Sequence, residues 1–339
     1  MRKFIQQLTI WITVVVYSFF LSGTAAFAAP APTPQSTAKN GQALEIAPPV
    51  IYLSVDPGQT TKTQILIRDI SSGDLIVNGT VNNFVSGGED GTPKILLDEK
   101  DNANDPYTVV GWIAPLASIL LVPHEIKTLT ATINVPKDAS PGGHYGVIRF
   151  TSTPPTPDGS GVSLAASIGV LVLITVSGKI TEGLSVQELS VSHNGKKGSF
   201  FESGPVEFTE KYKNTGNVHI QPVGQVGITD MFGRKLAAVN VNTPPGNVLP
   251  QSTRTFKQAL DKAVIGNKRL FGRYKATLKT TYGSDKKVIT STVVFWIIPY
   301  RLVAAVILAL VSLFFLLRFL IRRYNRRILA QAQKRNQPK

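Results

Sequence analysis

One apolar stretch, residues 302–317, constrains the whole chain more than any other feature. It reads LVAAVILALVSLFFLL, without a charge or a proline. Together with the apolar residues on either side, it reaches the ~20 residues that cross a bilayer as a helix. Trp296, Tyr300 and Tyr324 flank it, as aromatic side chains do at membrane interfaces. We therefore predict a transmembrane helix over residues 297–321, with a buried helix of a soluble core as the alternative.

Basic side chains follow this stretch at once and define a predicted orientation. Those nearest the span are Arg318, Arg322, Arg323, Arg326 and Arg327. An excess of Lys and Arg beside a span marks its cytoplasmic side. These arginines are therefore expected to orient the helix, with residues 322–339 as a basic cytoplasmic tail. The chain before the helix is then extracellular, anchored to the cell membrane by a single pass.

The N-terminus has the three parts of a secretory signal peptide, which we assign to residues 1–28. Arg2 and Lys3 precede the apolar residues 10–21, and Ala26-Phe27-Ala28 is a small-x-small cleavage site. The alternative is an uncleaved N-terminal anchor. Residues 29–43 are rich in proline and small polar residues, which predicts a disordered linker.

The net charge of +15 is unevenly distributed along the chain. Residues 44–178 carry 7 basic and 13 acidic side chains, whereas residues 179–301 carry 18 basic and 8 acidic ones. A further 8 basic side chains follow residue 317. Much of the excess is therefore a topology signal beside the membrane, and the pI of about 9.9 does not predict nucleic-acid binding.

The chemistry that the chain can carry is limited. The chain has no cysteine, which excludes disulfides, zinc–thiolate sites and thiol nucleophiles. Its four histidines lie far apart without ligand spacing, and no nucleophile elbow, phosphate loop or dinucleotide fingerprint appears. We expect no enzymatic activity and no cofactor.

Short alternating runs dominate the region between the two ends. Ile65 and Ile67 alternate with Leu66 and Arg68, and a later run alternates Tyr274, Ala276, Leu278, Thr280 and Tyr282 with lysines and threonines. A period of two with β-branched residues indicates half-buried strands. The sequence thus predicts an all-β ectodomain of two tandem immunoglobulin-like β-sandwiches, residues 44–178 and 179–296, followed by one transmembrane α-helix. Residues 162–176 are predicted to form a buried strand.

Several motifs of the first sandwich recur in a known family. They are Val55-Asp56-Pro57-Gly58-Gln59, Trp112, Leu121-Val122-Pro123-His124-Glu125, Val135-Pro136 and Pro141-Gly142-Gly143-His144-Tyr145-Gly146. With the order of parts, they resemble the peptidoglycan-binding domain of the WxL-interacting proteins of Gram-positive bacteria. The resemblance covers most of the mature chain. It implies that the first sandwich contacts cell-wall peptidoglycan and the second a partner surface protein.

Two candidate sites stand out. Trp112 is a candidate for stacking on a sugar ring of a glycan, with packing in the sandwich core as the alternative. Asp98, Asp101 and Asp105 offer the oxygen ligands that calcium prefers, although their spacing departs from a calcium-loop motif and a solvated turn is the alternative.

The sequence therefore favours a membrane-anchored bacterial envelope protein that binds peptidoglycan, a secreted or surface protein, or both. One alternative is an assembly or secretion factor that binds a client protein along a strand edge. Another is a signalling receptor acting through its basic tail. All three are bound to the lipid bilayer.

Overall fold

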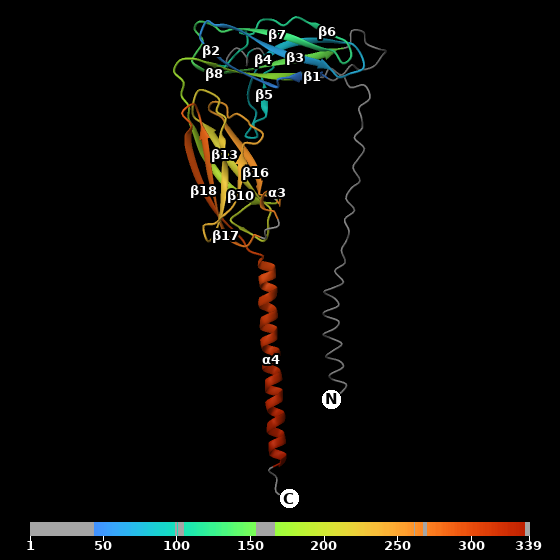
Figure 1. Ribbon diagram of the computed structural model, residues 1–339, viewed down its shortest axis with the longest axis vertical. Coiled ribbons are helices and arrows are strands. Elements are labelled where there is room, and N and C mark those ends of the chain that lie inside the picture. The colour runs from blue at the N-terminus through green and yellow to red at the C-terminus, as the bar shows by residue number, and fades with distance from the viewer. Residues whose placement is uncertain are drawn as a thin grey trace. The chain divides into compact units, whose positions relative to one another are not determined.

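The described residues of the computed structural model are 44–98, 100, 105–153, 167–260, 262–266 and 270–335. Their strands form four sheets, and each sheet takes its strands either from β1–β9 or from β10–β18 (Figure 1). Two sheets share one apolar core in each set, which we call sandwich 1 and sandwich 2. The predicted fold class, two immunoglobulin-like sandwiches followed by one helix, is confirmed. The signal peptide and the linker lie outside the described residues, and the domain boundaries stay predictions.

Sandwich 1 consists of a three-stranded and a six-stranded sheet. The first has the order β1 (Leu44–Ala47), β3 (Thr60–Asp69) and β7 (Ile126–Asn134). The second, which we call the β2 sheet, has the order β2 (Val50–Val55), β9 (Ser167–Val176), β8 (Gly142–Thr153), β4 (Leu75–Ser86) and β5 (Pro93–Ile95), and β6 (Ile119–Leu121) also pairs with β4. The pairing of β2 with β9 is parallel, and the other pairings are antiparallel.

The alternation read from the sequence accounts for the core of sandwich 1. In β3, Ile65 and Ile67 are fully buried while Leu66 between them is exposed. A tight turn over Asp56–Gln59 leads into β3, because Gln59 N–H donates to the Asp56 carbonyl at 3.1 Å and Gly58 has a φ of 80°. Proline followed by a residue with positive φ is the arrangement of a type II turn.

Strand β9 explains the second apolar run of the sequence. The prediction of a buried strand over residues 162–176 is confirmed for Ser167–Val176, and residues 162–166 lie outside the described residues. Val172 and Ile174 face the sandwich core, whereas Leu171 and Leu173 belong to a second apolar cluster on the other face of the sheet. Because both faces are covered, the strand reads as continuous apolar sequence.

Sandwich 2 has the same two-layer plan. One sheet has the order β11 (Lys196–Lys197), β10 (Leu184–His193), β13 (Val206–Asn214) and β16 (Thr253–Leu260). The other has the order β12 (Phe200–Phe201), β18 (Lys287–Ile297), β17 (Gly272–Tyr282), β14 (Val223–Asp230) and β15 (Lys235–Val241). A single helical turn, α3 (Lys262–Ile265), follows β16. The predicted alternation in β17 is confirmed, since Ala276 and Leu278 are fully buried while Lys275 and Lys279 are exposed.

One side chain in the core of sandwich 2 is acidic. Glu210 lies on β13 in phase with the buried Phe208 and Tyr212, and it is fully buried. Neither of its carboxylate oxygens has a hydrogen-bond partner among the described residues. Burial, with a smaller contribution from the neighbouring Glu207, raises the pKa of Glu210 to about 8. The core therefore favours a neutral carboxyl group at this position.

The apolar C-terminal stretch forms α4 (Tyr300–Arg335), and Tyr300–Arg326 is long and apolar enough to cross a membrane. The most apolar 18-residue window of this segment has a mean hydropathy of 2.7, and none of that window is buried against the rest of the chain. Helix α4 starts directly after Pro299, whose carbonyl accepts a hydrogen bond from Val303 N–H at 3.0 Å. Since β18 ends at Ile297, the join between sandwich 2 and the helix is as short as the sequence indicates.

Candidate binding site at the junction of the two sandwiches

The β2 sheet carries an apolar cluster on the face that points away from its own sandwich core. Phe84, Tyr145, Val147 and Leu173 are its buried members, and Leu249 of sandwich 2 packs against them. Strands β4, β8 and β9 carry apolar side chains on both faces of the sheet. The face that points away from the core of sandwich 1 must therefore also be shielded from water. Sandwich 2 supplies that cover, which brings residues from both sandwiches to one place.

Backbone hydrogen bonds join the two sandwiches at Asn217. The carbonyl of Asn217 accepts the N–H of Gly143 at 2.7 Å, and its side-chain amide donates to the Pro141 carbonyl at 3.1 Å. A side chain at Gly142 would collide with Asn217, and Gly142 has a φ of 127°. Gly142 is thus required here both by its conformation and by the close approach of Asn217.

Three aromatic rings meet beside this contact. His219 of sandwich 2 lies 5.8 Å from the ring of Tyr52 and 5.8 Å from that of Tyr145, measured between ring centroids. Burial lowers the pKa of His219 to about 4, and burial also raises the pKa of Tyr145. The ring of His219 is therefore neutral at pH 7 and stays neutral as the pH falls toward about 4.

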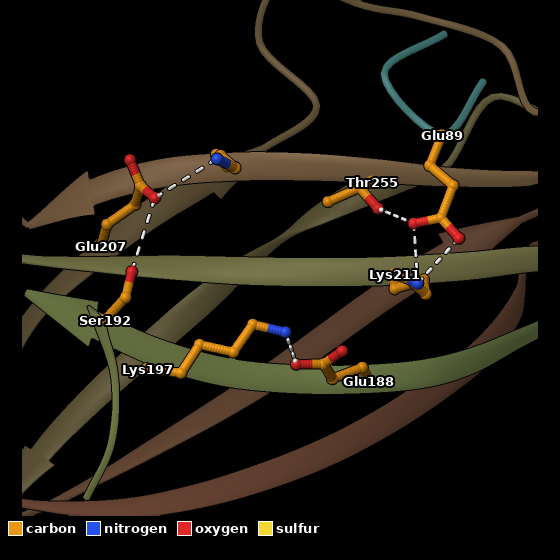
Figure 2. Close-up of polar contacts among 8 residues, drawn as sticks. Glu89, Glu188, Ser192, Lys197, Glu207, Lys211 and Thr255 are labelled. Carbon is orange, nitrogen blue, oxygen red and sulfur yellow. Dashed lines mark hydrogen bonds and ion pairs between the residues drawn. The ribbon is translucent and has the colours of Figure 1, made fainter. Parts of the chain in front are cut away.

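A charged contact forms a third link, shown at the right of Figure 2. Glu89, from the loop between β4 and β5, lies 2.7 Å from the Lys211 ammonium, and its backbone carbonyl accepts Thr255 N–H at 2.6 Å. The carbonyl contact uses the outer edge of β16. Both charged side chains are partly solvent-exposed, so the ion pair orients the sandwiches more than it stabilises them.

A cavity of about 210 Å³ opens between these links. Val50, Tyr52, Leu171 and Leu173 form its floor on the β2 sheet, and the segment from Pro245 to Arg254 forms its opposite wall. The floor is mostly apolar. A cavity of this kind, with a few polar groups at its rim, is the usual form of a recognition site.

Arg254 is the cation of this cavity. Its guanidinium lies so close to Gly91 and Gly246 that a side chain on either glycine would collide with it. Nη1 donates to the Asn247 carbonyl at 2.8 Å, whereas Nε has no partner among the described residues. Partial burial lowers the pKa of Arg254, yet an arginine stays charged at neutral pH. Its remaining donors suit a carboxylate.

Strand β2 borders the cavity and has one unpaired edge. The carbonyls of Pro49 and Val55 accept hydrogen bonds from β9, so the backbone groups of the odd-numbered residues face β9. Those of Val50, Tyr52 and Ser54 therefore face outward. Among the described residues, none of these three makes a backbone hydrogen bond on that side. The side chains of Val50 and Tyr52 line the cavity, so the free edge and the apolar floor are adjacent.

The structure places the sequence-predicted residues elsewhere. Trp112 is 7% exposed and packs in the core of sandwich 1, with its ring centroid 4.4 Å from that of His144, which matches the core-packing alternative. Asp98 is exposed, and Asp101 lies outside the described residues. Asp105 accepts the N–H of Tyr107 at 3.0 Å, as in a local turn. Among the described residues no group of three His, Cys, Asp or Glu side chains is placed to hold a metal ion.

The basic residues beside the span lie on one helix. Arg318, Arg322, Arg323, Arg326 and Arg327 all belong to α4, and their orienting role stays a prediction. The site at the junction could not be predicted from the sequence, because Tyr52, His219 and Arg254 are far apart in the chain. The one local signal that could have found the site is Tyr52, whose ring is out of phase with the apolar Ile51, Leu53 and Val55 of the same strand.

No protein-family model matches the chain, and no curated protein does. Among solved structures, the chain is similar to the YadV chaperone, at 10% identity and a TM-score of 0.36, over 74% of this chain and 99% of that chain. It is also similar to the class 5 fimbriae chaperone CfaA (14%, 0.38, 74% and 98%). A third match is the Salmonella enterica SafA pilin in complex with the SafB chaperone (10%, 0.36, 76% and 99%). At these values the likenesses carry no argument about function.

Proposed function

We propose that this protein is a non-enzymatic binding protein, anchored to the membrane by α4, that holds an extended segment of a partner protein along β2. The segment would add a strand to the β2 sheet at its free edge. This is the strand-edge alternative of the sequence analysis, located at one strand. The expected orientation, with both sandwiches outside the cell, is part of the proposal.

The observation that carries the proposal is the coincidence of a free strand edge with an apolar cavity. Strand addition takes its affinity from main-chain hydrogen bonds and its specificity from pockets for alternate side chains. Val50, Tyr52 and Ser54 offer the main-chain groups, and the floor of Leu171 and Leu173 offers the pocket. Exposed edges are normally blocked by charge, proline or short length, and none of the three residues is charged or a proline.

Arg254 gives the partner segment a chemical preference. A cation with unpaired donors at the wall of an apolar cavity favours an acidic group beside apolar side chains. We therefore expect a partner segment in which every second residue is apolar and in which one carboxylate lies close to Arg254 of this protein.

A single proline tests the proposal. Ser54→Pro removes an outward-facing N–H and leaves the bonds from β2 to β9 intact, because those involve the odd-numbered residues. A photo-cross-linking amino acid at Tyr52 of the full-length chain, in the cell of origin, should give a discrete protein adduct. Ser54→Pro should abolish the adduct, and the matched Ser54→Ala variant should retain it.

An adduct that forms equally in the Ser54→Pro variant would contradict strand addition. Co-sedimentation of the full-length chain with purified peptidoglycan tests the alternative that the protein binds the cell wall instead of a protein segment. Binding to peptidoglycan that resists moderate salt and is unaffected by Ser54→Pro, without a protein adduct, would favour glycan attachment instead.

A further inference from the structure

Sandwich 2 exposes apolar side chains at the end where the chain enters α4. We call this group the membrane-proximal rim; its exposed members are Phe200, Met231, Phe232, Phe271 and Tyr300, and the half-buried Trp296 lies among them. Phe232 is 73% exposed and Phe200 71% exposed, more than any other described aromatic residue of either sandwich. Side chains this large and this exposed rarely gather on a soluble surface without a partner.

The first part of the rim is attached to the end of β18. Strand β12 pairs with β18 so that Phe200 lies opposite Trp296, and their rings are stacked with centroids 6.1 Å apart. Next to β12, Glu202 lies 3.4 Å from Arg301 in the first turn of α4. Two contacts therefore hold β12 against the start of the helix.

The second part comes from two loops on the neighbouring strands. Met231 lies on Gly272, where a side chain would collide with the Met231 methyl group. Gly272 in turn lies opposite Ile297, the last residue of β18. Phe232 follows Met231, and Phe271 precedes Gly272, so both phenylalanines are carried to the same end of the sandwich.

Cations lie among these aromatic side chains. The Arg234 guanidinium lies 5.1 Å from the centre of the Phe232 ring and 2.7 Å from Asp230. Arg273 is exposed on β17, opposite Trp296. Aromatic rings mixed with arginines are typical of the interfacial layer of a bilayer, where rings sit at headgroup depth and guanidinium groups reach phosphates.

We propose that the membrane-proximal rim inserts into the interfacial layer of the bilayer that α4 crosses. The inference rests on α4 being a membrane span. Three peptide units separate Ile297 from Tyr300, so the end of β18, next to which the rim lies, is within about 11 Å of the first helical residue. Lipid headgroups necessarily surround that residue when α4 is inserted, which makes lipid the occupant of the rim. Sandwich 2 is then seated on the membrane as well as tethered to it.

The absence of cysteine allows a direct test by single-site labelling of the full-length chain. Phe232→Cys and Phe271→Cys carry an environment-sensitive fluorophore in liposomes of phosphatidylcholine and phosphatidylglycerol. Val223→Cys is the matched control, because Val223 is also exposed but begins β14, about 23 Å along the strand from Asp230. Leu310→Cys reports whether α4 itself is inserted.

The proposal predicts a blue shift of the fluorophore at Phe232→Cys and Phe271→Cys. It also predicts that lipids carrying a shallow nitroxide quench the fluorescence at both positions. Val223→Cys should show neither effect. Quenching of Leu310→Cys by a deep nitroxide with no quenching at the two rim positions overturns the rim alone. No quenching at any position overturns the membrane span and the rim together. A blue shift without lipid quenching means that protein covers the rim, and this also overturns the proposal. The Tyr52 adduct tests a different residue and is unaffected by each outcome.

Discussion

The two sandwiches share a layered plan but differ in where they tolerate polarity. Sandwich 1 has an apolar core and a second apolar cluster on the outside of its β2 sheet. Both sandwiches bury a carboxyl group: Asp69, at the end of β3, accepts the N–H of Ser71 at 2.6 Å, whereas neither oxygen of Glu210 in sandwich 2 has a hydrogen-bond partner among the described residues. Sandwich 2 also exposes apolar side chains at the end next to α4. In the two proposals made above, the same fold uses its uncovered apolar surface for different partners. Sandwich 1 would use it at the junction and its free strand edge, and sandwich 2 would use it at the membrane.

The largest predicted effect tests whether the two sandwiches have separate cores. Phe295 is fully buried and packs against Phe201, Phe208 and Tyr274, so Phe295→Ala should cost sandwich 2 about 3–5 kcal/mol of unfolding free energy. Urea unfolding followed by Trp296 fluorescence measures it, while Trp112 reports sandwich 1. Val288→Ala, at an exposed position of the same strand, should change the free energy by less than about 0.5 kcal/mol. Equal loss in both sandwiches would contradict separate cores.

The second prediction concerns Glu210, the buried carboxyl group of sandwich 2, whose two oxygens both lack a hydrogen-bond partner among the described residues. Burial raises the pKa of Glu210 from 4.5 to about 8, so the folded state binds a proton that the unfolded state has released. The stability of sandwich 2 should therefore fall as pH rises from about 4.5 to 8, by up to about 1.4 kcal/mol per pH unit. Glu210→Gln should flatten this dependence. The control Glu207→Gln, at a partly exposed position, should leave most of the pH dependence in place. A pH dependence that Glu210→Gln does not change would contradict its origin in Glu210.

A third prediction concerns the junction. Burial lowers the pKa of His219 from 6.5 to about 4, so the separated state binds a proton that the closed junction excludes. The junction should lose stability as pH falls from 6.5 toward 4, by up to about 1.4 kcal/mol per pH unit. An NMR titration of the His219 ring measures the shift directly. Tyr145→Ala should return its pKa toward 6.5, and His219→Phe should remove the pH dependence of the junction.

The smallest predicted effect is that of the ion pair across the junction. Glu89 and Lys211 are partly exposed, so Glu89→Gln should cost no more than about 1 kcal/mol, and less at high salt. The backbone bond from Thr255 to Glu89 survives this substitution. A loss of several kcal/mol in the unfolding free energy would show that the junction depends on the charge.

Local patterns predicted the fold well because burial in a strand alternates with a period of two. Ile65 and Ile67 in β3, Ala276 and Leu278 in β17, and the apolar helix α4 follow from neighbouring residues alone. The same alternation puts Phe208, Glu210 and Tyr212 on one face of β13. A carboxylate at such a position normally indicates a solvent-exposed face, so the sequence alone does not predict that Glu210 is buried.

The candidate site could not be predicted in the same way, because it exists only in the folded chain. Tyr52 meets Asn247 at 2.7 Å across 195 residues of sequence. The glycines that let Arg254 into the cavity, Gly91 and Gly246, belong to different sandwiches. Trp112 illustrates the converse problem, since its position in a loop-like sequence does not reveal that it is buried.

The central claim is that the outward-facing amides of β2 are free in this protein and become paired by a partner strand. Amide hydrogen exchange at single-residue resolution measures both states. In the free chain, Tyr52 and Ser54 should exchange much faster than Ile51 and Leu53, whose amides face β9. In the complex with the cross-linked partner, Tyr52 and Ser54 should become protected. Slow exchange of both amides in the free chain, or no protection in the complex, would contradict the claim.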